Sequence, residues 1–504
     1  MRKLFIYLCI LFSSLVYADS YWVSFTDKKS TSGTLNNPLE YLSARAIERR
    51  QKQSIAIDSL DLPVSSLYVD SLQKLGCRVD FVSRWLNGVT VEIDDNDNLP
   101  DVLRKLDFVS YIERTRITSK SSVNALRLSN KNKYKIRLGE KADSTDTQTQ
   151  QLNLNLLHEA GYKGKGILMA IIDDGFNGVD KLEAFANARE RIVATHDFVN
   201  PADMQDVYCT KNPSQGDHGT MVFSTIAAIT EGYTGNATEA DYILLRSEDD
   251  IYENLREVDA LVAAFEYADS AGVDICSSSL GYLDMFDDAT TNPTYQQMDG
   301  RTMRSSVAAT IAARKGMLMC VAAGNEGDVE WHYIDSPADA DSILTVGAVD
   351  KYGHIARFSS YGPSADGRLK PEVCALGSKA SIISVGGNIR TSNGTSFSTP
   401  IMAGAAACLW SALPDLSNMQ IRERICMSAS MAQEPNNRMG YGVPDMWKAY
   451  QNATNQTDVI NQPIFNNQVE WFDLLGNRYL DHKSLHQGIY IMSDGKTKKK
   501  ILIR

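Results

Sequence analysis

The sequence predicts an α/β fold built on a doubly wound, mainly parallel sheet, and two observations support this prediction. Between residues 152 and 450, apolar runs of strand length alternate with segments of helical pattern, which is typical of a parallel sheet with helices on both faces. The run 167–172 is continuously apolar, as expected for a strand buried on both faces. A small α+β region is expected before this fold, and a small β region after it.

The expected elements follow in a regular order along the chain. We expect further strands at 242–245, 273–278, 317–323 and 343–349, and helices at 221–229, 255–271 and 302–314. In the helix 255–271, apolar residues recur at helical spacing, so this face belongs to the core rather than to a binding groove.

Three polar residues stand at the ends of these buried elements. Asp173 follows the strand 167–172, and open α/β sheets place their functional sites at that edge. His218 precedes the apolar segment 221–229. Ser396 lies between the turn at Gly394 and a long run of small apolar residues, 401–409, which is expected to form a buried helix.

An Asp, a His and a Ser are the parts of a hydrolytic triad. A serine hydroxyl needs an imidazole to accept its proton, and the imidazole needs a buried carboxylate to fix its tautomer. Asp173, His218 and Ser396 fit these three roles. Taken alone, Ser396 would equally fit an ordinary helix N-cap, so the hypothesis depends on the three residues together.

A tetrahedral intermediate also needs hydrogen-bond donors aimed at its oxyanion. The apolar strand 317–323 ends in Gly324 and Asn325. The Asn325 amide is the candidate donor, and Gly324 would let a substrate approach the backbone.

These motifs resemble those of the subtilisin family of serine peptidases. The segment 171–175 (Ile-Ile-Asp-Asp-Gly) is similar to the family's aspartate motif, 218–222 (His-Gly-Thr-Met-Val) to its histidine motif, and 394–400 (Gly-Thr-Ser-Phe-Ser-Thr-Pro) to its serine motif. The segment 322–325 resembles the oxyanion segment. Ser279, Leu280 and Gly281 resemble the edge segment that pairs with the substrate backbone. The resemblance implies a subtilisin-like fold over residues 152–450 and a secreted endopeptidase that forms an acyl-enzyme on Ser396.

Two positions depart from the family pattern. Asp174 stands where the family more often has Ser or Thr, and Phe397-Ser398 replaces the commoner Met-Ala. If both Asp173 and Asp174 are buried, the pKa of one of them should rise; Asp174 could equally face solvent. Neither change removes a catalytic group. The alternative from another class of function is a surface adhesin on an inactive peptidase scaffold.

Two other classes of hydrolase lack their motifs. There is no G-x-S-x-G motif, and His158-Glu159 has no second histidine at the H-E-x-x-H spacing. No metal is therefore predicted in the reaction, and no cofactor is required. Family members often bind structural calcium, to which Asp284, Asp287 and Asp288 could contribute; a solvated acidic loop is the simpler interpretation.

The N-terminus has the pattern of a secretory signal peptide. Residues 1–18 combine Arg2-Lys3, a short apolar stretch and a small-residue exit at Ala18. No later segment is apolar for long enough to form a transmembrane helix. We therefore expect a cleaved signal peptide and a protein that is secreted or held at the cell surface.

The net charge of the chain argues against one class of partner. The formal charge is −11, and loss of Arg2 and Lys3 with the signal takes it to −13, which disfavours nucleic acid as a partner. Lys498-Lys499-Lys500 fits a solvated strand face better than a basic patch.

Apart from Cys9, seven cysteines remain with no C-x-x-C spacing. In the family's fold Cys276 and Cys320 end neighbouring strands, so a disulfide between them is one alternative; buried free thiols are the other.

Residues 19–118 are predicted to form a separate α+β domain, with strands at 21–25 and 89–93, a further segment at 108–112, and helices at 38–52 and 63–75. Its position before the subtilisin-like region suggests a propeptide, which in the family assists folding and inhibits the enzyme. Arg49-Arg50 fits a solvated helix face better than a processing site. Residues 119–151 are polar and are predicted to be an exposed linker where maturation cuts.

The end of the chain is predicted to hold a second linker, 451–468, and a small β domain, 469–504. Asp494-Gly495 indicates a hairpin. The tail resembles the C-terminal sorting domain of type IX secretion cargo; the alternative is a stabilising β appendage. The expected partners are protein or peptide substrates, the chain's own propeptide and a secretion machinery.

Overall fold

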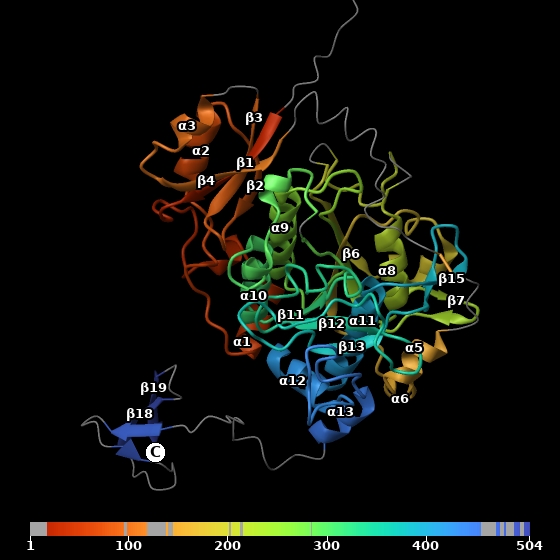
Figure 1. Ribbon diagram of the computed structural model, residues 1–504. Coiled ribbons are helices and arrows are strands. Elements are labelled where there is room, and N and C mark those ends of the chain that lie inside the picture. Colours follow the sequence, from red (N-terminus) through yellow and green to blue (C-terminus); the bar gives the residue numbers. More distant parts are fainter. Residues whose placement is uncertain are drawn as a thin grey trace, which may run out of the picture. The chain divides into compact units, whose positions relative to one another are not determined.

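A computed structural model describes most of the chain (Figure 1). The described residues are 18–94, 98–117, 138–139, 145–200, 203–211, 215–283 and 285–454, followed by four strands within 470–503. The signal segment 1–17 and most of the predicted linkers 119–151 and 451–468 lie outside them.

A seven-stranded sheet forms the centre of the large domain, and each pair of neighbouring strands is parallel. The strand order is β13-β12-β11-β10-β5-β9-β6. The strands are β5 (Leu168–Asp173), β6 (Ile192–Asp197), β9 (Asp241–Arg246), β10 (Ile275–Ser278), β11 (Leu318–Ala322), β12 (Leu344–Val349) and β13 (Val373–Leu376). The predicted parallel sheet is confirmed.

Helices cover both faces of this sheet, which confirms the doubly wound arrangement. Alternate side chains of β5 enter two separate apolar cores: Met169 and Ile171 point into one, and Ala170 and Ile172 into the other. The first core contains residues of α8 (Asp217–Ala227) and α11 (Thr395–Ala412), and the second contains residues of α9 (Leu255–Ala271) and α10 (Arg304–Arg314).

Shorter elements complete the large domain. They are α5 (Asp146–Gln151), α6 (Leu154–Glu159), η2 (Glu183–Phe185), α7 (Ala186–Arg189), β7 (Ile229–Thr230), β8 (Tyr233–Thr234), η3 (Ala289–Thr291), η4 (Tyr295–Gln297), β14 (Ala380–Ile383), β15 (Ile389–Ser392), α12 (Asn418–Ser428) and α13 (Met446–Thr454). The predicted exposed linker is wrong at its end, because α5 is ordered there and Gln148 is buried, accepting the backbone N–H of Ser381 at 3.0 Å.

The N-terminal region folds as a four-stranded antiparallel sheet in the order β2-β3-β1-β4. Its elements are β1 (Ala18–Phe25), η1 (Pro38–Glu40), α1 (Ala44–Lys52), α2 (Ser66–Lys74), β2 (Arg78–Ser83), β3 (Gly88–Asp94), α3 (Leu99–Leu103) and β4 (Val109–Arg116). The helix predicted over 38–52 is instead broken into η1 and α1, and the Ser43 side chain caps α1 by accepting the Ala46 N–H.

This N-terminal domain contacts the large domain through buried charges on α9. Asp269 accepts hydrogen bonds from Arg49 (2.5 Å), Arg50 (2.7 Å) and Arg84 (2.7 Å), and its side chain is fully buried. The solvated face predicted for Arg49-Arg50 is therefore wrong. Both guanidinium groups are buried because their carboxylate partner lies in the other domain.

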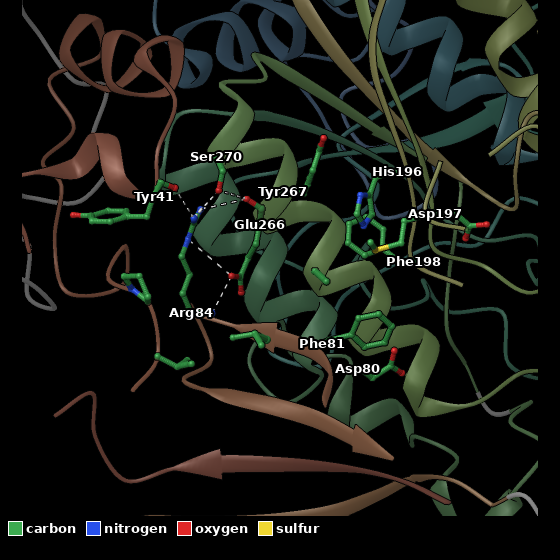
Figure 2. Close-up of a pocket in the computed structure, with 15 residues that line it drawn as sticks. Tyr41, Asp80, Phe81, Arg84, His196, Asp197, Phe198, Glu266, Tyr267 and Ser270 are labelled. Carbon is green, nitrogen blue, oxygen red and sulfur yellow. Dashed lines mark hydrogen bonds and ion pairs between the residues drawn. The ribbon is translucent and has the colours of Figure 1, made fainter. Parts of the chain in front are cut away.

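A second group of contacts joins the same two domains. Lys315 binds Asp58 and Asp61 at 2.9 and 2.8 Å, and Arg256 binds Asp80 at 2.6 Å. Beside these contacts, a cavity of about 370 Å³ lies between the domains. Figure 2 shows Arg84 at its edge, hydrogen-bonded to Ser270 and Glu266 of α9.

The seven described cysteines are all free thiols and all buried. Cys276 and Cys320 belong to different apolar cores, on opposite faces of the central sheet. The alternative of a disulfide between them is therefore not realised, since their side chains point apart across the sheet.

The C-terminal part, Ala453–Arg504, forms a compact unit of its own. Its described strands make an antiparallel sheet in the order β17-β16-β18-β19. They are β16 (Glu470–Asp473), β17 (Arg478–Tyr479), β18 (Gly488–Ser493) and β19 (Lys498–Ile503). Among the residues that the structure describes, no helix combines the length and apolar character that a membrane crossing requires.

Candidate active site

Asp173 and His218 form a buried hydrogen-bonded pair at the edge of the central sheet. Asp173 is the last residue of β5, and His218 is the second residue of α8. His218 Nδ1 lies 2.6 Å from Asp173 Oδ1, and both side chains are almost completely buried. The carboxylate holds the Nδ1 proton, which leaves Nε2 as the basic nitrogen of the ring.

Gly219 allows α8 to approach the aspartate. A Cβ at this position would lie 2.1 Å from the Gly175 carbonyl oxygen and 2.8 Å from Asp173 Cβ. A larger residue would therefore push the first turn of α8 away from β5, and with it the imidazole of His218.

Ser396 is the second residue of α11, a helix of 18 residues that packs on α8. The ring of Phe397, the next residue, lies 5.9 Å from the His218 ring between centroids. Gly394 immediately precedes the helix and has φ 151°, in the range that favours glycine. Because the first N–H groups of a helix have no acceptor within it, the Ser396 N–H is available to an anion.

Asn325 lies beside the same helix terminus. Its side-chain oxygen accepts the Thr395 N–H at 2.8 Å and the Thr395 hydroxyl at 3.2 Å. These bonds fix the orientation of the amide and leave its Nδ2 as a donor. Asn325 is exposed, so this donor belongs to a surface that a substrate can reach.

The predicted substrate segment 279–281 follows β10 and contacts the serine directly. Ser279 Oγ donates to the Ser396 carbonyl oxygen at 2.9 Å. Leu280 is buried in the core, whereas Gly281 is partly exposed. The structure thus brings Ser279 to Ser396 and Gly324 to Thr395, whose hydroxyl accepts the Gly324 N–H at 3.2 Å.

Asp174 is buried and does not face solvent. Its carboxyl accepts the N–H groups of His218 (3.3 Å) and Gly219 (2.8 Å) at the start of α8. Burial raises the pKa of Asp174 well above its usual range, and the charges of Asp173 and Asp250 add to this effect. Burial also raises the pKa of Asp250, which hydrogen-bonds Asp174.

Sequence reasoning missed Asp250. This residue accepts the Gly216 N–H at 3.1 Å and pairs with Asp174 across the loop that precedes α8. No motif marked it, because it comes from the segment after β9, distant in the chain. The run Glu248-Asp249-Asp250 was the only signal in the sequence, and acidic runs are usually solvated.

The acidic loop proposed for calcium does not form a cation cage in the described residues. Asp288 Oδ1 accepts the N–H and hydroxyl of Thr290, and Asp287 Oδ2 accepts the Glu253 N–H; Asp284 lies outside the description. Two other groups bring three ligand atoms within 4.8 Å, namely Asp173, Asp174 and His218, and Glu248, Glu253 and Glu257. In both groups, backbone N–H donors already occupy carboxylate oxygens.

Comparison with known proteins identifies both main parts of the chain. Residues 164–442 match the model of the subtilase family (peptidase S8), and residues 20–134 match a peptidase S8 propeptide domain of Bacteroidota. Subtilisin NAT of Bacillus subtilis subsp. natto is 28% identical over 364 residues, 72% of this chain and 80% of that protein. The human membrane-bound transcription factor site-1 protease is 27% identical over 320 residues, 60% of this chain.

The match to the human protease spans only 26% of that protein's length. Among solved structures, MycP1 of Mycobacterium smegmatis superimposes with a TM-score of 0.49 at 22% identity, covering 66% of this chain and 91% of that one. The family match covers more than half of the chain, and the close pair of Asp173 and His218 is consistent with it. The chain therefore belongs to the subtilase family and carries an N-terminal propeptide domain of that family.

Proposed function

We propose that this protein is a secreted serine endopeptidase that hydrolyses peptide bonds of proteins through an acyl-enzyme on Ser396. The observation that carries the proposal is the buried 2.6 Å contact between Asp173 and His218, next to a helix that begins at Thr395. Asp173 fixes the imidazole, His218 removes the Ser396 proton, and the hydroxyl oxygen attacks the substrate carbonyl. His218 then returns the proton to the leaving amine.

The oxyanion of the tetrahedral intermediate would be held by two donors. The Ser396 N–H belongs to the first turn of α11, and the Asn325 amide is oriented by Thr395. Donors fixed in advance stabilise the developing charge without reorganisation. Residues 279–281 and Gly324 would pair with the substrate backbone. No step needs a cofactor or a metal ion, since these groups supply the nucleophile, the base and the oxyanion donors.

The N-terminal domain would keep the precursor inactive until the linker is cut. Its buried ion pairs with α9 and Lys315 support a stable contact between the two domains in the precursor. Removal of one member of such a pair is costly, because the other charge stays buried. We propose that maturation cuts within 119–151.

Export would use both ends of the chain. The pattern of residues 1–18 supports a cleaved signal peptide, and the separate C-terminal sheet unit supports a sorting domain for type IX secretion. Deletion of 469–504 should leave the peptidase inside the cell envelope and keep its activity in lysed cells. Normal release of the truncated protein would instead favour a stabilising appendage.

Peptide hydrolysis by the full chain tests the proposed activity. We expect a denatured protein substrate to be cleaved, and the Ser396→Ala and His218→Ala variants to lose about 10⁶-fold in kcat, the loss known for subtilisin itself. Equal cleavage by wild type and Ser396→Ala would refute the mechanism. An inactive adhesin would cleave nothing, and its serine would not react with a fluorophosphonate.

A further inference from the structure

Residues 335–336 join the two segments proposed to bind the substrate backbone. The Asp335 N–H donates to the Ala323 carbonyl oxygen at 3.3 Å, just before Gly324. Ser336 and Tyr282 exchange two backbone hydrogen bonds, of 2.8 and 3.1 Å, just after Gly281. Asp335 is thereby placed between the ends of the two segments, close to the residues expected to hold the scissile carbonyl.

The carboxyl group of Asp335 lies directly against both glycines. A Cβ on Gly281 would be 2.9 Å from Asp335 Oδ2, and a Cβ on Gly324 would be 2.4 Å from the same oxygen. Gly324 also has φ 108°, which disfavours any side chain. Because neither glycine has a side chain, the backbone of both residues can lie against the Asp335 carboxyl group. Asp335 itself is only 3% exposed.

A second carboxyl group completes the pair. Glu326 hydrogen-bonds Asp335, and it also accepts the Asn325 N–H at 2.5 Å and the Ser360 hydroxyl at 3.1 Å. Burial raises the pKa of Glu326, and these bonds oppose the rise. The hydrogen bond between two carboxyl groups requires a proton on one of them. A cation from a ligand could replace that proton.

We infer that Asp335 and Glu326 select a cationic side chain, lysine or arginine, in the substrate residue whose carbonyl Ser396 attacks. This inference rests on the proposed peptidase function. The carbonyl oxygen of that substrate residue would lie at the Asn325 amide and the Ser396 N–H. Gly324 and Glu326 are the chain neighbours of Asn325, so the same substrate residue would lie beside Gly324 and close to the acidic pair. A guanidinium or ammonium group there would form charge-assisted hydrogen bonds with two carboxylates. A neutral side chain would leave the acidic pair buried without this gain.

A matched series of peptides tests the inference on the full chain after it has cleaved its linker. The peptides differ only in the residue before the scissile bond: Arg, Lys, Gln, Leu or Glu. We expect kcat/KM for Arg and Lys to exceed that for Gln and Leu by about tenfold or more, and Glu to be poorest. Glutamine has a long polar side chain without a charge, so the comparison separates charge from size.

Variants then assign the preference to the pair. Asp335→Asn and Glu326→Gln should each lower the ratio of Arg to Leu hydrolysis by about tenfold. Asp328→Asn is the matched control, since it removes an exposed negative charge from the same loop. This control should leave the ratio unchanged.

The outcomes separate this inference from the proposed function. Wild-type rates for Leu or Gln equal to those for Arg would overturn the inference, whether or not the variants fold, while peptidase activity would stand. An unchanged ratio in folded Asp335→Asn and Glu326→Gln proteins would also overturn it. If no peptide is cleaved and Ser396 does not react with a fluorophosphonate, the proposed function fails and the inference fails with it.

Discussion

The Asp174 carboxyl accepts the backbone N–H of Gly219 at 2.8 Å, at the start of the helix that carries His218. The chain thus places two adjacent acids in different roles. Asp173 contacts the imidazole through its side chain, whereas Asp174 holds the helix that positions that imidazole. The raised pKa of Asp174 follows from this buried position beside a second carboxylate.

This relationship predicts a pH-dependent effect of Asp174→Asn on stability. The pKa of Asp174 is raised in the folded protein above its ordinary value of 3.8. The folded state therefore binds the proton more tightly than the unfolded state, and this contribution to stability is lost as the pH rises through the folded pKa. Asparagine imitates the neutral acid and does not ionise.

We expect the melting temperature of Asp174→Asn, relative to wild type, to increase as the pH rises from the ordinary value of 3.8 toward the raised pKa of folded Asp174. Thermal unfolding of both proteins in the inactive Ser396→Ala background measures this difference without self-digestion. The matched control is Asp101→Asn, which removes an exposed acid of the N-terminal domain. A constant difference for Asp174→Asn over this range would show that Asp174 is ionised throughout.

The contact between the N-terminal domain and α9 should depend on Asp269. Replacement by Asn leaves three buried guanidinium groups, those of Arg49, Arg50 and Arg84, without their carboxylate. Loss of one partner of a buried ion pair costs about 3–5 kcal/mol. In Ser396→Ala protein, we expect Asp269→Asn to make residues 19–118 far more sensitive to trypsin.

Two observations would check this prediction. Asp101→Asn breaks an exposed pair with Arg104, which contributes only about 0–1 kcal/mol, so its digestion should match that of the parent. Equal protection of residues 19–118 in Asp269→Asn and in the parent would contradict the view that the buried ion pairs hold the N-terminal domain in place.

Several of these features could be predicted from the sequence because their signals are local. The helix α9 was predicted with its observed ends, since Asn254 caps its start and Gly272, with φ 88°, ends it. The positions of Asp173, His218 and Ser396 followed from apolar runs and from the residues beside them. The proposed triad is recognisable because each member ends or begins a buried element.

Other features depend on partners that are distant in the chain. Arg49 and Arg50 looked like a solvated face because their partner Asp269 lies about 220 positions later. The strand β2 was missed because its apolar residues do not alternate: the apolar Val82 is exposed, whereas its neighbours Phe81 and the polar Ser83 are buried. The buried state of Asp174 depends on α8, which no pattern around residue 174 reveals.

The oxyanion donor should affect turnover more than binding. Thr395 orients the Asn325 amide through two hydrogen bonds. We expect Asn325→Ala to lower kcat by about 10²–10³-fold, the loss that one such donor causes in subtilisin, with little change in KM. Steady-state kinetics on one peptide substrate measures both. A higher KM at unchanged kcat would assign Asn325 to ground-state binding instead.

Chelation should not affect hydrolysis. We expect EDTA to leave both the initial rate and the melting temperature unchanged. In the proposed mechanism Ser396, His218 and two oxyanion donors perform each step, and the oxygens of Asp287 and Asp288 bind protein N–H and hydroxyl groups. A lower melting temperature that calcium alone restores would place a structural calcium ion in the protein. An activity loss restored by zinc would instead indicate a metallopeptidase.

The most direct test of the account is covalent labelling of Ser396. The chain is incubated with a fluorophosphonate before and after cleavage of its linker, and the modified peptide is identified by mass spectrometry. We expect one adduct, on Ser396 of the cleaved form, and its loss in His218→Ala, because only an activated serine reacts at a useful rate. Absence of an adduct from both forms of the folded wild-type protein would contradict the proposed catalytic relay.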